Sequence, residues 1–201
     1  MALRTWSTNK AQLHLMEKMD FHCETRLKND RGEGIDTLYF VKEITGKGIR
    51  AYGYTIGNGK CGIRNTITDV PGVKVGHYTV RKGKNQTGVT VIIPCDGFVY
   101  ERKPLAAVYA LNGFGKTQGT VQIEELGVLE TPIALTNTLN VGKAADGLVT
   151  FTEKECRKNG KELVSVNPVV GETNDSRINQ ITERVIEAED VLFAIEHAEK
   201  N

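Results

Sequence analysis

The sequence predicts an α/β fold, and three observations support this. Short runs rich in β-branched residues recur along the chain and are bounded by glycine or proline. Between and after these runs lie segments whose apolar residues recur at helical spacing. Most of the 21 glycines lie between Gly46 and Gly147, where they mark tight turns or a close approach of backbone. Alternating strands and helices are typical of an α/β domain.

Three strands are expected in the first half of the chain, which also shows a weak helical period at Leu13 and Met16. Residues 37–44 (TLYFVKEI) are β-branched and aromatic enough for one strand. A turn follows at residues 69–72, where Pro-Gly suits the centre of a type II turn. Residues 73–76 then alternate, as in a strand with one buried face. Residues 87–94 (TGVTVIIP) form a nearly continuous apolar run and predict a central strand, which Pro94 ends.

The second half is expected to alternate helices and strands. In chain order these are a helix over 105–111, a strand over 132–136, a helix over 144–158, a strand within 163–175 and a helical segment over 181–195. Gly160 is well placed to end the third of these elements in a left-handed conformation. Glu187 and Asp190 are suited to begin the second piece of the last segment.

Charge and hydropathy argue against several classes of protein. The 26 Lys and Arg residues balance 25 Asp and Glu residues, so there is no basic excess for binding nucleic acid. No apolar run is long enough to span a membrane, and the first 20 residues lack the apolar core of a secretory signal. The four cysteines form no C-x-x-C pair, which favours reduced thiols in a cytoplasmic protein and no metal site.

Two regions differ in composition. Residues 1–47 are polar and mixed in charge, and we expect an N-terminal appendage without chemistry of its own. Residues 48–201 carry the glycine-rich turns and the apolar strands, so they are expected to form the functional domain.

The glycine-rich segment from Asn112 to Gly119 is the first candidate binding site, with Asn112, Gly113, Gly115 and Lys116 as its candidate residues. Its spacing fits neither the phosphate-binding loop nor the dinucleotide fingerprint. Three interpretations remain open: a tight turn that needs a positive φ angle, a nucleotide site, or a loop whose backbone approaches a substrate.

Polar residues after two strands are the second group of candidates. Asn137 directly follows the strand at 132–136. Lys143 lies six residues later and has two interpretations: a base or charge stabiliser, or a solvated side chain. Asn174 and Asn179 follow the strand within 163–175. An asparagine amide can stabilise an oxyanion, but these residues also suit turns and helix caps.

Familiar catalytic motifs are missing. The sequence contains no G-x-S-x-G nucleophile elbow and no H-E-x-x-H motif. His77 could act as a base, although a lone histidine at a strand end more often makes a structural hydrogen bond. Nothing calls for a metal or another cofactor.

Five segments occur in order along the chain: TITDVPGVKVGH, TGVTVIIP, LNGFGKTQG, IEELGVLETPIALTNTLNVG and VNPVVGETND. Together they resemble the aminopeptidase family that includes L-aminopeptidase/D-amidase-esterases and β-peptidyl aminopeptidases, with nylon-oligomer hydrolases as distant members. The resemblance covers residues 48–198. It implies an α-β-β-α sandwich similar to that of N-terminal-nucleophile hydrolases, with residues 48–201 as its N-terminal (α) portion.

The resemblance also implies an activity. Such proteins cut themselves before a Ser or Thr, which becomes the nucleophile and whose own α-amine serves as the base. They then release N-terminal amino acids from peptides, amides or esters through an acyl-enzyme. The nucleophile is expected beyond the last helix, so this chain would end before it and be inactive alone. The expected partners are a C-terminal (β) portion carrying the nucleophile, a small peptide or amino-acid amide, and further copies in a homo-oligomer.

Site residues follow from the same resemblance. Asn179 is the first choice for the oxyanion-stabilising asparagine and Asn174 the second. Lys143 matches a lysine that works with the asparagine in nylon hydrolases. The family loop often reads N-G-x-G-E, with the Glu expected to meet the substrate amine, whereas Lys116 stands there in this chain. This departure favours an anionic or amide-only substrate, or a different partner for the amine.

Two other functions remain open. A non-catalytic binding or structural module with the same fold would need no nucleophile and would tolerate Lys116. Acetyl transfer, as in the related ornithine acetyltransferase fold, matches the motifs less well.

Overall fold

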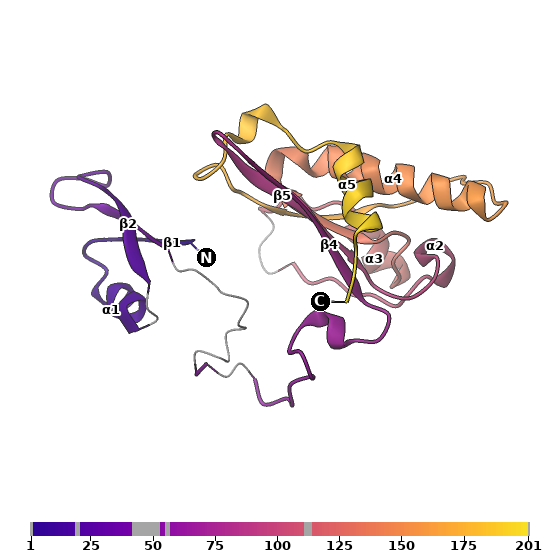
Figure 1. The fold of residues 1–201 in the computed structure, drawn as a ribbon, viewed down its shortest axis with the longest axis horizontal. Helices are drawn as coiled ribbons and strands as arrows, with labels where there is room; N and C mark the ends of the chain where they lie inside the picture. The colour runs from indigo at the N-terminus through magenta and orange to yellow at the C-terminus, as the bar shows by residue number, and fades with distance from the viewer. Residues whose placement is uncertain (1, 19–20, 42–52, 55–56, 111–113, 201) are drawn as a thin grey trace. The chain divides into compact units, whose positions relative to one another are not determined.

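The structure, a computed structural model, describes residues 2–18, 21–41, 53–54, 57–110 and 114–200. The chain divides into two compact units, Met1–Lys60 and Cys61–Asn201 (Figure 1). The boundary expected between residues 47 and 48 lies outside the described residues.

The first unit is a small three-stranded antiparallel sheet with one helix. Its elements are β1 (Ala2–Trp6), α1 (Lys10–Lys18), β2 (His22–Leu27) and β3 (Thr37–Val41). The strand order is β1-β3-β2, and a small core forms around Met16 and Phe40. The strand expected over 37–44 is confirmed as far as Val41, and the rest of that range lies outside the described residues.

The second unit contains a four-stranded sheet in the order β4-β5-β6-β7. Its strands are β4 (Lys74–Lys82), β5 (Asn85–Ile93), β6 (Ile133–Asn137) and β7 (Val169–Thr173). The pairs β4–β5 and β5–β6 are antiparallel, whereas β6–β7 is parallel. All four strands were expected, and β5 is internal, as its apolar run predicts.

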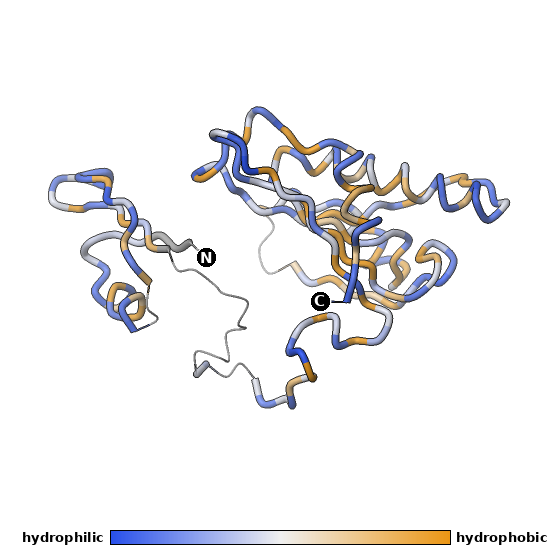
Figure 2. Tube along the Cα trace, viewed as in Figure 1, coloured by the Kyte–Doolittle hydropathy of each residue, from blue (hydrophilic) through white to orange (hydrophobic). Residues whose placement is uncertain are grey.

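Two helices, α4 (Val141–Lys158) and α5 (Ala188–Glu196), pack against one face of this sheet (Figure 1). The core contains side chains from both helices and from β5 to β7, and Val91, Leu148 and Val191 have no exposed surface. Figure 2 shows apolar residues gathered at the centre of the sheet and polar residues at the β4–β5 hairpin. The helix expected over 144–158 is therefore confirmed.

The ends of these helices follow the expected signals. Gly160, with φ of +66°, lies just beyond α4 in the left-handed conformation. Glu187 and Asp190 form a capping box at the start of α5, in which Asp190 accepts a hydrogen bond from the Glu187 backbone N–H. The expected helical segment over 181–195 is divided, because only Ile181–Glu183 forms a 3₁₀ turn before the chain extends toward α5.

Short elements complete the unit: η2 (Ile67–Asp69), α2 (Val99–Arg102), α3 (Thr120–Leu126) and η3 (Thr138–Asn140). A second apolar cluster joins α2 and α3 to the start of β7 through Val99, Ile123 and Val169.

The helix expected over 105–111 is wrong. Residues 105–110 are not helical; instead Leu105 bridges Val128, and the Ala106 N–H donates to the Gly127 carbonyl. Ala106 and Val108 pack against the second apolar cluster, whereas the residues that alternate with them are exposed. This period of two belongs to extended backbone, so pairing with 127–128 overrides helix propensity.

Candidate functional site

The ends of three neighbouring strands meet at one edge of the four-stranded sheet. Because β6 and β7 are parallel, their carboxyl ends lie side by side, and Asn137 pairs with Thr173 in register. Strand β5 runs antiparallel to β6, so its amino end, with Thr87, lies at the same edge. Polar side chains from segments far apart in sequence are therefore brought together.

Three hydrogen bonds between side chains and one from a backbone N–H connect these segments. Thr87 Oγ1 donates to Asp175 Oδ2 (2.6 Å) and accepts from Asn137 Nδ2 (2.8 Å). Asn179 Nδ2 donates to Asp175 Oδ1 (3.1 Å), and Asn179 Oδ1 accepts from the Gln86 backbone N–H (3.1 Å). We refer to Gln86, Thr87, Asn137, Asp175 and Asn179 as the strand-end network.

An open hollow of about 380 Å³ adjoins the strand-end network. Its lining includes Thr87, Asn137 and Asp175, together with His77 and Leu135. The side chains of His77 and Leu135 alternate along their strands with residues of the helix-side core, so they belong to the opposite face of the sheet. The hollow therefore combines polar groups of the network with that face.

His77 occupies a structural position in this lining. Its Nδ1 hydrogen bonds to Thr90 Oγ1 at 2.9 Å, across the β4–β5 pair. This is the structural hydrogen bond that the sequence favours over a role as a base.

The glycine-rich segment lies beside β7. Asn112 and Gly113 are outside the described residues. Gln118 exchanges two backbone hydrogen bonds with Val170 of β7, at 2.9 and 3.1 Å. This pairing brings Gly115 close to Glu172, since a Cβ atom on Gly115 would lie 3.8 Å from Glu172 Oε1.

Two residues of this segment show how it is held. Lys116 is exposed, and its Nζ donates to the Phe114 carbonyl (2.9 Å) and lies 3.7 Å from the centre of the Phe114 ring. Gly119 has φ of +84°, a conformation that glycine adopts readily. At this residue the structure agrees with the interpretation of the segment as a tight turn that needs a positive φ angle.

Lys143 and Asn174 make contacts outside the strand-end network. Lys143 Nζ donates to Glu187 Oε1 (2.5 Å) and to the Arg184 carbonyl (2.8 Å), which connects α4 to the start of α5. Asn174 is exposed, and its Oδ1 accepts from the Ser176 N–H. Of the candidate residues, the structure thus brings Asn137 and Asn179 into one network, and their catalytic roles stay predictions.

Sequence reasoning does not single out Thr87, which joins the two halves of the network. Its only local signal is a threonine at the start of an apolar run. The contact to Asp175 depends on the pairing of β5 with β6, which brings together residues 88 positions apart.

Metal binding and membrane insertion find no support among the residues that the structure describes. These residues include no group of three or more His, Cys, Asp or Glu side chains able to hold a metal. Their helices are all too short or too polar to cross a bilayer. All four cysteines are free thiols, and burial raises the pKa of Cys95, which disfavours the reactive thiolate.

Comparison with known proteins places the second unit among peptidases. Residues 65–201 match the family model of peptidase family S58. The chain is 35% identical over 150 residues to β-peptidyl aminopeptidase BapA of Sphingosinicella microcystinivorans, across 70% of this chain and 36% of that protein.

Solved structures agree with this assignment. A crystal structure of a protein from Pyrococcus horikoshii OT3 is similar with a TM-score of 0.70 and 45% identity, over 76% of this chain and 46% of that one. The L-aminopeptidase D-Ala-esterase/amidase of Ochrobactrum anthropi, described as a variant of the Ntn hydrolase fold, gives 0.64 and 30%, over 73% and 43%.

These findings confirm the resemblance seen in the sequence and the fold class that it implies. The chain spans less than half the length of each of these relatives. The family match covers most of the chain and includes the whole strand-end network. The chain therefore belongs to peptidase family S58.

Proposed function

We propose that this chain is the N-terminal (α) portion of a self-processing serine/threonine hydrolase. The complete protein would release N-terminal amino acids from peptides, amides or esters through an acyl-enzyme. The observation that carries this proposal is the family match over residues 65–201. The nucleophilic Ser or Thr would come from a C-terminal (β) portion, and the chain without it would be inactive.

Asn179 is the proposed oxyanion donor. Its side chain is only 7% exposed, and bonds to Gln86 and Asp175 fix the orientation of its amide. One hydrogen of the Nδ2 group bonds to Asp175, which leaves the second for a developing oxyanion. A donor fixed in advance needs little reorganisation as charge develops, which is the condition for strong electrostatic stabilisation.

Asn174 and Lys143 keep secondary roles in this proposal. Asn174 precedes Asp175 in the same loop and is the second choice for the donor. Lys143 would act with the donor asparagine only after leaving Glu187, because its Nζ is bonded to that carboxylate.

The glycine-rich segment and Asn137 are proposed to contact substrate. Gly115 lies near Glu172 of β7, Lys116 directly follows it, and Asn137 lines the hollow. A small peptide or amino-acid amide would bind there. We also propose a cytoplasmic protein in which complete copies assemble into a homo-oligomer.

The test uses the complete protein. Mass spectrometry should show cleavage before a Ser or Thr, and the product should hydrolyse amino-acid p-nitroanilides. In the Asn179→Ala variant we expect kcat to fall about 100-fold or more, since one oxyanion donor contributes about that much. Asn159→Ala, at the exposed end of α4, is the matched control and should keep full activity.

A complete protein that neither cleaves itself nor hydrolyses a panel of amides and esters would overturn the proposal. That outcome would favour the non-catalytic module. Transfer of the acetyl group from acetylornithine, in place of hydrolysis, would favour the acetyltransferase alternative.

A further inference from the structure

We propose that Asn137 Oδ1 is a fixed hydrogen-bond acceptor for an N–H group of the substrate bound in the hollow. The inference rests on the proposed function and adds one recognition contact to it. Thr87 is then a positioning residue for Asn137, because its hydroxyl oxygen accepts from Asn137 Nδ2 and so holds the amide in place.

The donors and acceptors of the strand-end network fix the orientation of the Asn137 side-chain amide. Thr87 has a single hydroxyl proton, and a carboxylate can only accept, so that proton is donated to Asp175. The oxygen of Thr87 must then accept the bond that it shares with Asn137. The atom of Asn137 that faces Thr87 is therefore Nδ2, and the amide cannot be reversed.

This orientation leaves the carbonyl of Asn137 without a partner. The side chain is 3% exposed, and Oδ1 has no hydrogen bond among the described residues. Buried polar groups are rarely left unpaired, because the loss of water is then uncompensated. Oδ1 itself has almost no exposed surface, but Asn137 lines the hollow, so we assign a bound molecule as the partner of this atom.

A second buried asparagine shows why the hollow matters. Asn140 has no exposed surface, and both polar atoms of its amide lack partners within the part of the chain that the structure describes. It is not part of the lining of the hollow, so nothing indicates a ligand there. Asn137 combines the two features, an unmet acceptor and an adjoining space.

The acceptor indicates which substrate groups fit. A neutral carbonyl oxygen accepts from an amide N–H or from an ammonium group and offers nothing to an anion. In an amino-acid amide both donors exist, the N–H of the bond to be cut and the free amine. Either would complete the bonding of Asn137.

The experiment compares substrates that differ in one donor, using the complete protein and its Asn137→Ala variant. L-Alaninamide against L-alanine methyl ester tests the amide N–H, and L-alaninamide against L-lactamide tests the ammonium group. We expect the variant to lower one of these two preferences, measured as a ratio of kcat/KM, by about threefold to tenfold. The change should lie mainly in KM, because the bond forms with the bound substrate.

Thr87 provides an independent arm that leaves Asn137 in place. Thr87→Val removes the group that holds Nδ2 and should lower the same preference, whereas Thr87→Ser keeps the hydroxyl and should restore it. Thr152→Val is the matched control, because it removes a buried threonine bond to the Leu148 carbonyl inside α4. Urea unfolding of each variant separates loss of folding from loss of recognition.

The outcomes are distinguishable. An inactive wild-type protein contradicts the proposed function. An active wild type whose two preferences are unchanged in Asn137→Ala overturns this inference alone. If Asn137→Ala does not fold, equal preferences in Thr87→Val and Thr87→Ser overturn it instead.

Discussion

The hydroxyl of Thr87 donates a 2.6 Å hydrogen bond to the carboxylate of Asp175, which joins the amino end of β5 to the loop after β7. The same carboxylate accepts from Asn179, and the Asp175 backbone carbonyl accepts from the N–H groups of Ile178 and Asn179. Asp175 therefore sets the path of the loop as well as the position of the proposed oxyanion donor.

Removing this carboxylate should cost stability. We expect Asp175→Ala to lower the free energy of unfolding by about 2–4 kcal/mol, because two side-chain bonds are lost and Thr87 and Asn179 are left unsatisfied. Urea unfolding measures the change. Asp146→Ala, on the exposed side of α4, is the control and should stay within about 0.5 kcal/mol of wild type. Equal effects at both positions would contradict a central role for Asp175.

The two described glycines of the glycine-rich segment should differ in their tolerance of a side chain. A Cβ atom on Gly119 would lie 2.5 Å from the Pro168 carbonyl oxygen, and its φ of +84° disfavours any L-residue. We expect Gly119→Ala to lower the free energy of unfolding by about 2–4 kcal/mol. The Cβ atom of Gly115→Ala would meet no atom of the described residues closer than 3.8 Å, so this variant should change the free energy of unfolding by less than about 0.5 kcal/mol.

Thermal and urea unfolding of both glycine variants measure these changes in the free energy of unfolding. A Gly119→Ala protein as stable as wild type would show that the turn does not need this backbone conformation.

Glu130 should make stability depend on pH. Burial acts to raise the pKa of Glu130, but hydrogen bonds from Lys103 and Asn167 outweigh it and hold the pKa below its ordinary value of 4.5. A carboxyl whose native pKa is lowered stabilises the fold above its unfolded-state pKa, and this stabilisation is lost as the pH falls through the native pKa.

We therefore expect Glu130→Gln to be less stable than wild type at pH 7, by about 1–3 kcal/mol, and to lose less stability than wild type as the pH falls below about 4.5. Urea unfolding between pH 3 and pH 7 measures both effects. Glu125→Gln, at an exposed position of α3, should reproduce the wild-type profile. Parallel profiles for Glu130→Gln and wild type would contradict the prediction.

Local signals explain what could be predicted from the sequence. The apolar run of β5, the helical spacing of α4 and the capping pair Glu187 and Asp190 all depend on residues close together in the chain, and all are confirmed. The helix predicted over 105–111 is wrong for the same reason. Its helix propensity is a local property, whereas the partner with which the segment pairs, residues 127–128, lies far along the chain.

The candidate site depends on contacts that no local pattern contains. Asn137 and Asn179 can be singled out as asparagines that follow strands, but their connection through Thr87 needs the register of three strands. The orientation of the Asn137 amide needs the position of a single hydroxyl proton. Such details follow from tertiary structure alone, whereas the family could be inferred from the order of five motifs.

Lys116 should set the preference of the complete protein for charged substrates. Lys116 is exposed and directly follows Gly115, which lies near Glu172 of β7, so its ammonium group would repel a substrate amine that approaches this segment. We expect Lys116→Glu to raise kcat/KM for L-alanine p-nitroanilide by about threefold to tenfold at low salt, and the gain to shrink as salt screens the charge.

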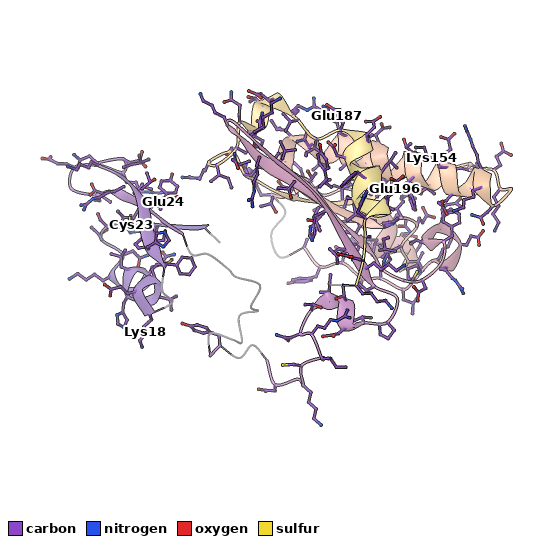
Figure 3. The ribbon with its side chains drawn as sticks, in the orientation of Figure 1. Lys18, Cys23, Glu24, Lys154, Glu187 and Glu196 are labelled. Atoms are coloured by element: carbon purple, nitrogen blue, oxygen red, sulfur yellow. The ribbon has the colours of Figure 1, made fainter. Side chains whose placement is uncertain are left out.

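The matched control is Lys154→Glu, which makes the same change in net charge at an exposed position of α4 (Figure 3). We expect Lys154→Glu to leave kcat/KM unchanged, because Lys154 is not in the proposed substrate-binding segment. An effect of net charge would appear in both variants, whereas a local effect would appear only in Lys116→Glu. A gain of equal size in both variants would mean that overall charge, and not Lys116, controls the approach of the substrate. A loss of activity in Lys116→Glu alone would instead mean that the lysine contacts an anionic part of the substrate.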